Sequence, residues 1–275
     1  MSDFLGYKGK RVVVTGCFSG MGEATAKRLL SLGAEVHGLD YKDCALDLAS
    51  FTKCDLRDPA SIDAAVGGLS GKIDALFNCA GLPQTFPPLE VMKVNFIGTR
   101  YLTEKVIPLM QGKGAVASIS SNGGLGWSRR MPVLMQILQL QGFDGPLKWC
   151  EENLETVGEG YALSKELVIA WTMFASFSLI SKGVRINCTT PGPTQTPMMN
   201  DFEAASAMSV LEFATRPIDR RSTPDEQASP LVFLNSDAAS FISGVSLPVD
   251  GGFMAGLATG QLDVAEMMKG ATKAA

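Results

Sequence analysis

Short apolar runs of strand type alternate with longer helical stretches along most of this 275-residue chain. The expected strands are rich in β-branched residues and stand at 11–16, 35–40, about 53–56, 74–81, 114–121, 184–192 and 245–252. Helical patterns between them cover 22–33, 89–110, 161–180 and the region near 224–236. Apolar strands that are separated by helices predict a parallel sheet with both faces covered. The expected fold class is therefore α/β, a Rossmann-type doubly wound parallel sheet of about seven strands.

Composition fits one globular domain spanning 1–275. Hydrophobic residues make up 46% and charged residues 19%, so the chain can bury a sizeable core, and no linker or repeat divides it. The net charge of −4 argues against nucleic acid or an anionic membrane as the main partner. The first residues show no signal-peptide pattern, and no apolar run approaches the roughly 20 residues of a membrane span, so a cytoplasmic protein is expected.

Metal chemistry is not expected. The six cysteines are scattered without a C-x-x-C pair, which is typical of free thiols in a reducing cytosol. The single histidine, His37, lies in a strand-like run, where packing against neighbours explains it better than a catalytic role. We therefore predict no metal site.

A glycine-rich loop, T-G-C-F-S-G-M-G, follows the first strand at 15–22. Gly16, Gly20 and Gly22 allow a tight turn and a close backbone approach, and the N-terminus of the helix that follows suits a pyrophosphate. A lone glycine loop can also be a plain tight turn. Its place at the first strand–helix junction favours a dinucleotide site.

Asp40 ends the second strand, 18 residues after Gly22, where its carboxylate can accept hydrogen bonds from the adenosine ribose. The same carboxylate would repel a 2′-phosphate. Neither Ser19 nor Tyr41 supplies a cation to attract one, and Lys42 is the nearest exception. NAD is therefore favoured over NADP as the cofactor.

Tyr161 and Lys165 stand four residues apart in Y-A-L-S-K. In a helix this spacing places the two side chains on one face. A cation close to a phenol favours the phenolate and lowers the pKa of the tyrosine, as proton transfer near neutral pH requires. The alternative reading is an ordinary helix surface, and the pair alone does not decide between them.

In chain order these motifs resemble the classical short-chain dehydrogenase/reductase family over about residues 8–253. The glycine loop resembles T-G-x-x-x-G-x-G, and N-C-A-G at 78–81 resembles N-N-A-G with Cys79 in place of the second asparagine. I-S-S-N-G-G, Y-A-L-S-K, P-G-P-T-Q-T-P at 191–197 and V-D-G-G at 249–252 resemble the remaining family segments. Extended members of the superfamily space their glycines differently, as T-G-x-x-G-x-x-G.

The resemblance implies a catalytic set of Asn95, Ser121, Tyr161 and Lys165. Tyr161 would be the general acid/base, supported by Lys165, and Ser121 would hold the substrate oxygen. Asn95 would hold a water that links Lys165 to solvent. Ser120 is the rival for the serine role, but the family pattern favours Ser121.

The resemblance also implies a set of cofactor contacts. Asp55 would touch the adenine, and Thr194 and Thr196 would fix the carboxamide of the nicotinamide. The full expected set is Gly16, Ser19, Gly20, Met21, Gly22, Asp40, Asp55, Leu56, Ala80, Gly81, Tyr161, Lys165, Pro191, Gly192, Thr194 and Thr196.

An insertion at about 128–158 separates Ser121 from Tyr161. Its apolar pattern predicts a helical hairpin, with helices starting at Pro132 and Pro146 and with Leu134 and Leu138 on one apolar face. It would pack on the body, contact another subunit, or cover the substrate. As a cover, its apolar face with Leu134 and Leu138 would contact a bulky substrate and leave the dinucleotide site alone. A substrate-loop region is expected at about 197–222 and a C-terminal tail at 253–275.

The insertion resembles that of a subgroup that includes bacterial 3α-hydroxysteroid dehydrogenase/carbonyl reductase and coniferyl alcohol dehydrogenase. It implies an NAD-dependent alcohol dehydrogenase/carbonyl reductase for a bulky apolar alcohol, either a hydroxysteroid or similar cyclic secondary alcohol, or an aryl-allylic alcohol. A catalytically silent NAD-binding scaffold or sensor and an NADP-linked ketoreductase are the rival readings. A homo-oligomer, dimer or tetramer, is expected, since related enzymes usually pair through the helices at 89–110 and 161–180.

Overall fold

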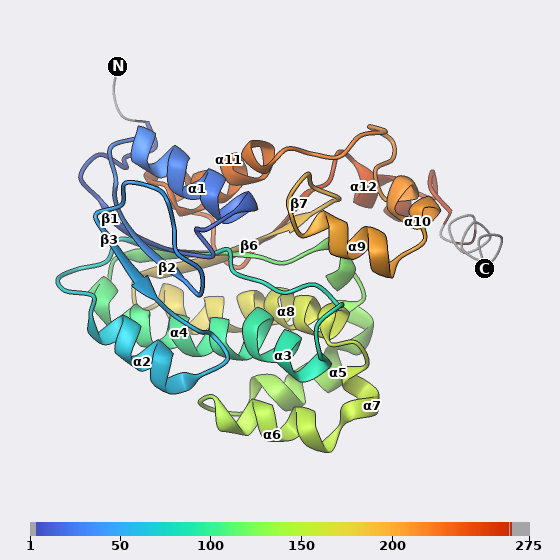
Figure 1. Cartoon of the computed structure of the whole chain (residues 1–275), viewed down its shortest axis with the longest axis horizontal. Coiled ribbons are helices and arrows are strands. Elements are labelled where there is room, and N and C mark those ends of the chain that lie inside the picture. Colours follow the sequence, from blue (N-terminus) through green and yellow to red (C-terminus); the bar gives the residue numbers. More distant parts are fainter. Residues whose placement is uncertain (1–3, 264, 266–275) are drawn as a thin grey trace.

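The computed structural model describes residues 4–263 and 265 and contains one parallel sheet of seven strands (Figure 1). The strand order is β3-β2-β1-β4-β5-β6-β7. The strands are β1 Arg11–Thr15, β2 Glu35–Asp40, β3 Ser50–Lys53, β4 Ala75–Asn78, β5 Gly114–Ile119, β6 Val184–Pro191 and β7 Ser246–Val249. The predicted fold class is confirmed, and the order reverses between β1 and β4, which opens a crevice at their carboxyl ends.

Helices cover both faces of the sheet because alternate strand residues face opposite ways. In β1, Val13 joins one buried cluster, and Val12 and Val14 join the other. Two helices lie on one face, α1 Gly20–Ser31 and α11 Pro224–Asn235 (Figure 1). The opposite face carries α2 Pro59–Gly67, α4 Thr99–Val106 and α8 Tyr161–Ile180.

The helix expected at 89–110 is divided. It consists of α3 Pro88–Met92, the π-helix η1 Lys93–Gly98, α4, and the 3₁₀-helix η2 Ile107–Met110. Gly98 lies directly against the loop after β3: a Cβ atom on it would stand 2.0 Å from the backbone oxygen of Leu56. The wider π turn holds Asn95, and such turns are frequent at functional sites.

The predicted insertion is helical and consists of α5 Trp127–Leu138, α6 Asp144–Glu152 and the short α7 Leu154–Val157. The expectation that its first helix starts at Pro132 was wrong, because α5 begins five residues earlier and contains Pro132. Trp127 and Met131 pack against the core. Their burial extends the helix backward although proline removes one backbone hydrogen bond.

The insertion forms a third layer outside α4 and α8 (Figure 1). The Arg100 guanidinium donates to the backbone oxygens of Leu138, at 3.3 Å, and Leu140, at 2.9 Å. Leu134 and Leu138 are 0% and 1% exposed within the main core cluster. The expectation that these two leucines form a substrate cover was therefore wrong. The insertion also lies over α4 and α8, which belong to the regions through which subunit pairing was expected. The oligomeric state stays a prediction.

One described helix, α8, is long and apolar enough by composition to cross a membrane, so the expectation that no such run exists was wrong. However, 61% of its apolar window is buried inside the protein. It packs between the sheet and α5 and carries the buried Lys165 and Glu166. These features are those of a core helix.

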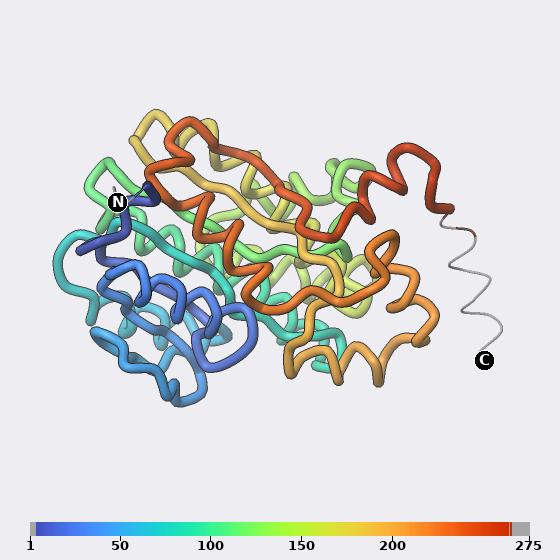
Figure 2. Tube along the Cα trace, turned by 90° about the horizontal axis from the view of Figure 1, so that it is seen from above, coloured from blue at the N-terminus to red at the C-terminus, as the bar shows by residue number. Residues whose placement is uncertain are grey.

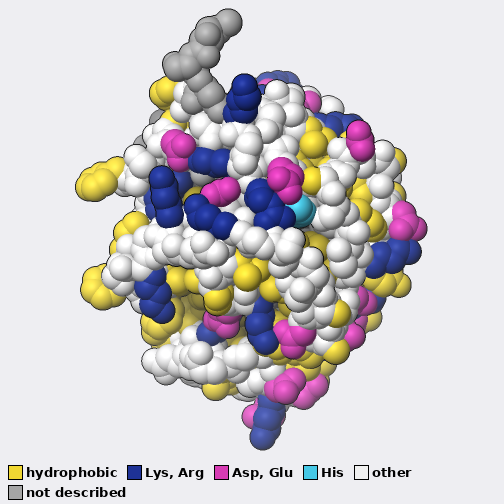
Figure 3. All heavy atoms as spheres, turned by 90° about the vertical axis from the view of Figure 1, so that its left-hand side faces the viewer, with side chains coloured by type: hydrophobic (Ala, Val, Ile, Leu, Met, Phe, Trp, Pro, Cys, Tyr) yellow, Lys and Arg dark blue, Asp and Glu magenta, His cyan; other side chains and the backbone are white. Residues whose placement is uncertain are grey.

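On the face shown in Figure 3, acidic and basic side chains are intermixed rather than gathered by sign.

Burial of the hairpin makes a stability prediction. Leu134→Ala should lower the free energy of unfolding by about 2–5 kcal/mol, because it leaves a cavity in the core. Leu154→Ala, at a position that is 55% exposed, should change it by less than about 0.5 kcal/mol. Denaturant unfolding measures both variants. Equal effects in the two would contradict the packing described here.

Candidate active site

The glycine loop lies against the end of β4. A Cβ atom on Gly16, which has φ +71°, would stand 2.6 Å from the Ala80 nitrogen, and one on Gly22 would stand 2.0 Å from the Gly16 oxygen. The buried Thr15 hydroxyl accepts hydrogen bonds from the backbone nitrogens of Cys79 and Ala80. Glycine is thus required at both positions, and the loop meets the first turn of α1 as a pyrophosphate cradle would.

A cavity of about 400 Å³ extends from this loop across the carboxyl ends of β1, β2 and β4. Its lining includes most of the predicted cofactor contacts, namely Gly16, Ser19, Gly20, Met21, Gly22, Asp40, Asp55, Leu56, Ala80, Gly81 and Thr196. The remaining predicted contacts lie elsewhere. Gly192 lines a second cavity, and Thr194 is buried with its hydroxyl 2.9 Å from that of Ser222. Pro191 ends β6 and is buried.

Asp40 stands at the end of β2 and joins two loops. Its carboxylate accepts hydrogen bonds from the backbone nitrogens of Phe18 and Lys42, both at 2.9 Å. The Lys42 ammonium lies 5.2 Å from the centre of the Phe18 ring. The Lys42 ammonium is thus held over an aromatic ring beside Asp40.

Asp55 is engaged by a neighbour that the sequence reasoning missed. The Arg57 guanidinium donates to both carboxylate oxygens of Asp55, at 2.7–3.1 Å, and lies 5.0 Å from the centre of the Tyr41 ring. These contacts lower the pKa of Asp55. The position of Arg57 two residues after Asp55 is the signal that would have indicated the pair.

Ser121 follows β5, Tyr161 and Lys165 lie in the first turns of α8, and the three residues meet near the carboxyl end of β5. The Lys165 ammonium donates to the Ile119 oxygen at 3.1 Å and lies 5.6 Å from the centre of the Tyr161 ring. Burial lowers the pKa of Lys165 to about 8. Burial raises the pKa of Tyr161, whereas a hydrogen bond with Ser121 lowers it.

Ser120 has a different environment from Ser121. Its hydroxyl is buried and donates to the backbone oxygen of Lys165 at 2.8 Å. That hydrogen bond ties β5 to α8. Of the two serines, only Ser121 lowers the pKa of Tyr161.

The Asn95 side chain is buried and fully engaged. It donates to the Leu82 oxygen at 2.9 Å and to the Ser164 hydroxyl at 3.3 Å, and it accepts from the Leu82 nitrogen at 2.7 Å. A Cβ atom on Gly81 would be 3.4 Å from the Asn95 oxygen and 3.8 Å from the Lys165 ammonium. Asn95 and Lys165 therefore flank the same glycine.

The segment after β6 closes over this region. Helices α9 Met199–Ala205 and α10 Met208–Phe213 lie within the expected substrate-loop region, beside the loop that follows β4 (Figures 1 and 2). The Thr85 hydroxyl, in the loop after β4, is 3.1 Å from a carboxylate oxygen of Asp201 in α9. Phe202 places its ring edge-on to that of Tyr161, with centres 5.2 Å apart. No sequence pattern indicated Phe202, since it lies 41 positions after Tyr161 in the chain.

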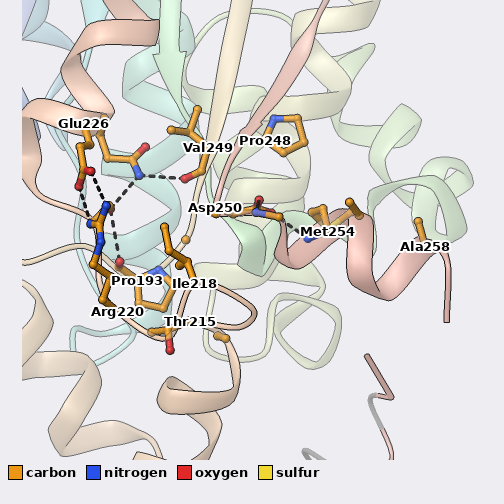
Figure 4. Close-up of a pocket in the computed structure, with 17 residues that line it drawn as sticks. Pro193, Thr215, Ile218, Arg220, Glu226, Pro248, Val249, Asp250, Met254 and Ala258 are labelled. Atoms are coloured by element: carbon orange, nitrogen blue, oxygen red, sulfur yellow. Dashed lines mark hydrogen bonds and ion pairs between the residues drawn. The ribbon is translucent and has the colours of Figure 1, made fainter. Parts of the chain in front are cut away.

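A second cavity, of about 690 Å³, lies between the loop after α10 and the residues from β7 to α12 Phe253–Ala258 (Figure 4). Ile218, Pro248 and Met254 give it a largely apolar lining. At one end, Arg220 and Glu226 form a bidentate ion pair at 2.7–2.9 Å. Among residues 4–263 and 265, no group of three His, Cys, Asp or Glu side chains is placed to hold a metal.

Family models match most of the chain. A model described as short chain dehydrogenase matches residues 10–133, and one described as Enoyl-(Acyl carrier protein) reductase matches residues 151–254. The chain belongs to the short-chain dehydrogenase/reductase family. This family binds a nicotinamide cofactor, and the glycine cradle described above fits one.

The relatives agree with the expected subgroup. Coniferyl-alcohol dehydrogenase from Pseudomonas sp. (strain HR199) is 36% identical, with 88% of this chain and 96% of that protein covered. The 3-alpha-hydroxysteroid dehydrogenase/carbonyl reductase of Comamonas testosteroni is 30% identical, covering 88% and 95%. The crystal structure of the 3-alpha-hydroxysteroid dehydrogenase from Pseudomonas sp. B-0831, complexed with NADH, has a TM-score of 0.77 at 28% identity, covering 92% and 99%.

The lowered pKa of Lys165 predicts a pH-dependent stability. Below about pH 8 the ammonium is charged in both states, and its burial destabilises the fold; between about pH 8 and 10.4 the folded state releases the proton first, and the penalty fades. In the ligand-free protein, Lys165→Met should therefore raise the free energy of unfolding at pH 7, by on the order of 2 kcal/mol.

Denaturant unfolding at pH 7 and pH 10 measures this gain, which should shrink at the higher pH. The exposed Lys182 provides the control variant, Lys182→Met. A gain for Lys165→Met that does not depend on pH would contradict burial of a charged ammonium as its cause.

Proposed function

We propose that this protein is an NAD-dependent alcohol dehydrogenase that also works in reverse as a carbonyl reductase. Its substrate would be a bulky apolar alcohol, either a hydroxysteroid or similar cyclic secondary alcohol, or an aryl-allylic alcohol of the coniferyl type. The observation that carries the proposal is the meeting of three side chains: the Ser121 side chain lowers the pKa of Tyr161, and the Lys165 ammonium lies 5.6 Å from the centre of the Tyr161 ring.

The proton would move through these side chains. Tyr161, as phenolate, takes the hydroxyl proton of the alcohol and, as phenol, returns it to the carbonyl in reverse. Ser121 holds the substrate oxygen and shares its developing charge. The ammonium of Lys165 favours the phenolate and offsets the effect of burial on the pKa of Tyr161. When bound, the oxidised cofactor supplies the hydride acceptor and a further positive charge.

Cofactor binding would follow the predicted contacts. Asp40 would accept hydrogen bonds from the adenosine ribose, and its charge supports NAD over NADP. The Arg57 and Tyr41 pair would face the adenine end, since both line the same cavity as Asp55. Thr196 would fix the carboxamide, and its side chain stands within 3.3 Å of a Cβ position on Gly20.

The proposed substrate class rests on the position of Phe202 and on the similarity of this chain to known dehydrogenases. An aromatic ring edge-on to Tyr161 offers an apolar wall to a ring-bearing alcohol and helps to exclude water from the phenol. Similarity to the coniferyl-alcohol and hydroxysteroid dehydrogenases supports both substrate types. We also propose that the protein is cytoplasmic and forms a homo-oligomer.

An absorbance screen of NAD reduction tests the proposal. It would compare coniferyl alcohol, a 3α-hydroxysteroid and cyclohexanol, each with NAD and with NADP. Reduction of NAD by at least one of these alcohols supports the dehydrogenase. Binding of NAD without turnover of any alcohol would instead support the silent scaffold or sensor, which the intact Ser121, Tyr161 and Lys165 disfavour.

Tyr161→Phe tests the acid–base role. The variant should lose more than about nine-tenths of kcat, at least 1.4 kcal/mol in the barrier, because only the phenolic oxygen is removed. NAD binding, followed by protein fluorescence, should persist. Tyr101→Phe serves as the control, since that hydroxyl contacts Asp63 on the far side of α4. Retention of more than about a tenth of kcat in Tyr161→Phe would exclude the assignment.

Asp40→Asn tests cofactor choice. The variant keeps a hydrogen-bond acceptor but removes the negative charge, so the NAD/NADP ratio of kcat/KM should fall about tenfold or more. Asp47→Asn makes the same charge change at an exposed position in the following loop and should leave the ratio unchanged. An unchanged ratio in Asp40→Asn would show that Asp40 does not discriminate between the cofactors.

A further inference from the structure

The insertion is joined to the site at both of its ends. Ser121 precedes its first helix, α5, and Gly123 lies between that serine and the phenol: a Cβ atom on Gly123 would stand 3.2 Å from a ring carbon of Tyr161 and 3.5 Å from the Ser121 hydroxyl oxygen. Thr156 lies in its last helix, α7, five positions before Tyr161. The distance between Ser121 and Tyr161 therefore depends on how the two ends of the insertion are held together.

Arg130, in α5, connects those two ends. Its guanidinium forms an ion pair with the Glu166 carboxylate of α8 at 3.0 Å and donates to the backbone oxygen of Thr156 at 3.1 Å. Glu166 directly follows Lys165, and its side chain is 4% exposed, against 34% for that of Arg130. One guanidinium thus joins the start of the insertion, its end, and the helix that carries Tyr161 and Lys165.

The segment between Ser121 and α5 lies directly against the same turn of α8. A Cβ atom on Gly124 would stand 2.9 Å from the Lys165 backbone oxygen. One on Gly126, which precedes α5, would stand 2.5 Å from a carboxylate oxygen of Glu166. The Glu166 carboxylate therefore lies beside the chain that leads out of Ser121 as well as beside the guanidinium.

Stability alone is a weak reason for this ion pair. Burial raises the pKa of Glu166, and the Arg130 guanidinium lowers it. A buried ion pair adds little stability over apolar residues of similar size, because both charged groups lose their hydration. The place of the pair, between α5 and the turn of α8 that carries Lys165, gives a more direct reason.

We propose that Arg130 is a positioning residue for proton transfer: through Glu166 and Thr156 it sets the distance between the Ser121 hydroxyl and Tyr161. This inference rests on the proposed function, in which those two side chains hold the reacting oxygen. Arg130 lines neither of the two cavities described above, so it acts through these contacts and touches neither substrate nor cofactor.

Arg130→Met tests the proposal with the alcohol that the absorbance screen finds best. The kcat of the variant should fall about tenfold or more, because small displacements of the Ser121 hydroxyl from Tyr161 are costly to the reaction. The KM for NAD should change by less than about twofold, since the dinucleotide contacts are untouched. A kcat that stays within about twofold of the wild-type value would overturn the proposal.

A double variant separates positioning from folding. Arg130→Met alone leaves a buried carboxylate without its cation and should lower Tm. Arg130→Met combined with Glu166→Gln removes the charge as well, so Tm should largely recover while kcat stays about tenfold low. Recovery of kcat together with Tm would assign the ion pair to the fold and overturn the proposal.

Arg100→Met is the matched control. Arg100 also ties the insertion to the body, through the backbone oxygens of Leu138 and Leu140, but it does so from α4. The variant should lower Tm and leave kcat within about twofold of the wild-type value. An equal loss of kcat in Arg100→Met and Arg130→Met would show that any loosening of the insertion has this effect, and the specific role of Arg130 would fail.

The pH dependence of kcat/KM supplies a readout that a purely structural role would not change. Tyr161 is flanked by the Ser121 side chain, which lowers its pKa, by the Lys165 ammonium and by the Phe202 ring. If Ser121 is displaced, the pKa of Tyr161 rises, and alcohol oxidation should then require a higher pH in Arg130→Met and in the double variant. An unshifted profile in both variants would contradict displacement of Ser121.

The outcomes separate this inference from the proposed function. If the wild type oxidises an alcohol with NAD and Arg130→Met does so equally well, only the positioning role fails. If the wild type binds NAD but oxidises no alcohol, the proposed function fails, and the positioning role of Arg130 fails with it.

Discussion

The contact between the glycine loop and the end of β4 is the constraint on which the site depends. Gly16 approaches the Ala80 backbone so closely that no side chain fits, and the Thr15 hydroxyl bridges the same two segments. This contact sets the depth of the crevice at the point where the strand order reverses. It also aims the N-terminus of α1 at the place where a dinucleotide phosphate would lie.

Burial of charge gives the site its chemistry. Lys165, in α8, is 5% exposed against the end of β5, and burial lowers its pKa to about 8. The same surroundings raise the pKa of Tyr161, so the phenolate of the proposed function would need the ammonium, the Ser121 side chain and the charge of a bound cofactor together. Under the proposed function, the buried ammonium would destabilise the ligand-free protein and support proton transfer.

The outer parts of the molecule divide into two roles. The insertion between Ser121 and Tyr161 is a packed third layer, held by buried leucines and by Arg100, and it supports α8 from behind. The segment that reaches the site is α9, through Phe202 and through the contact of Asp201 with Thr85. The insertion is joined in the chain to Ser121 and Tyr161, but the helix whose side chain contacts Tyr161 is α9.

The sequence by itself determined the fold class and most of the cofactor crevice, because strand periodicity, positive-φ glycines and Y-x-x-x-K spacing act over short stretches of chain. Only the tertiary structure decided what depends on residues distant in sequence. It placed Phe202 against Tyr161, buried Leu134 instead of leaving it to a substrate, and paired Arg130 with Glu166. Burial and hydrogen-bond satisfaction depend on every segment that packs around a side chain, and no local pattern records them.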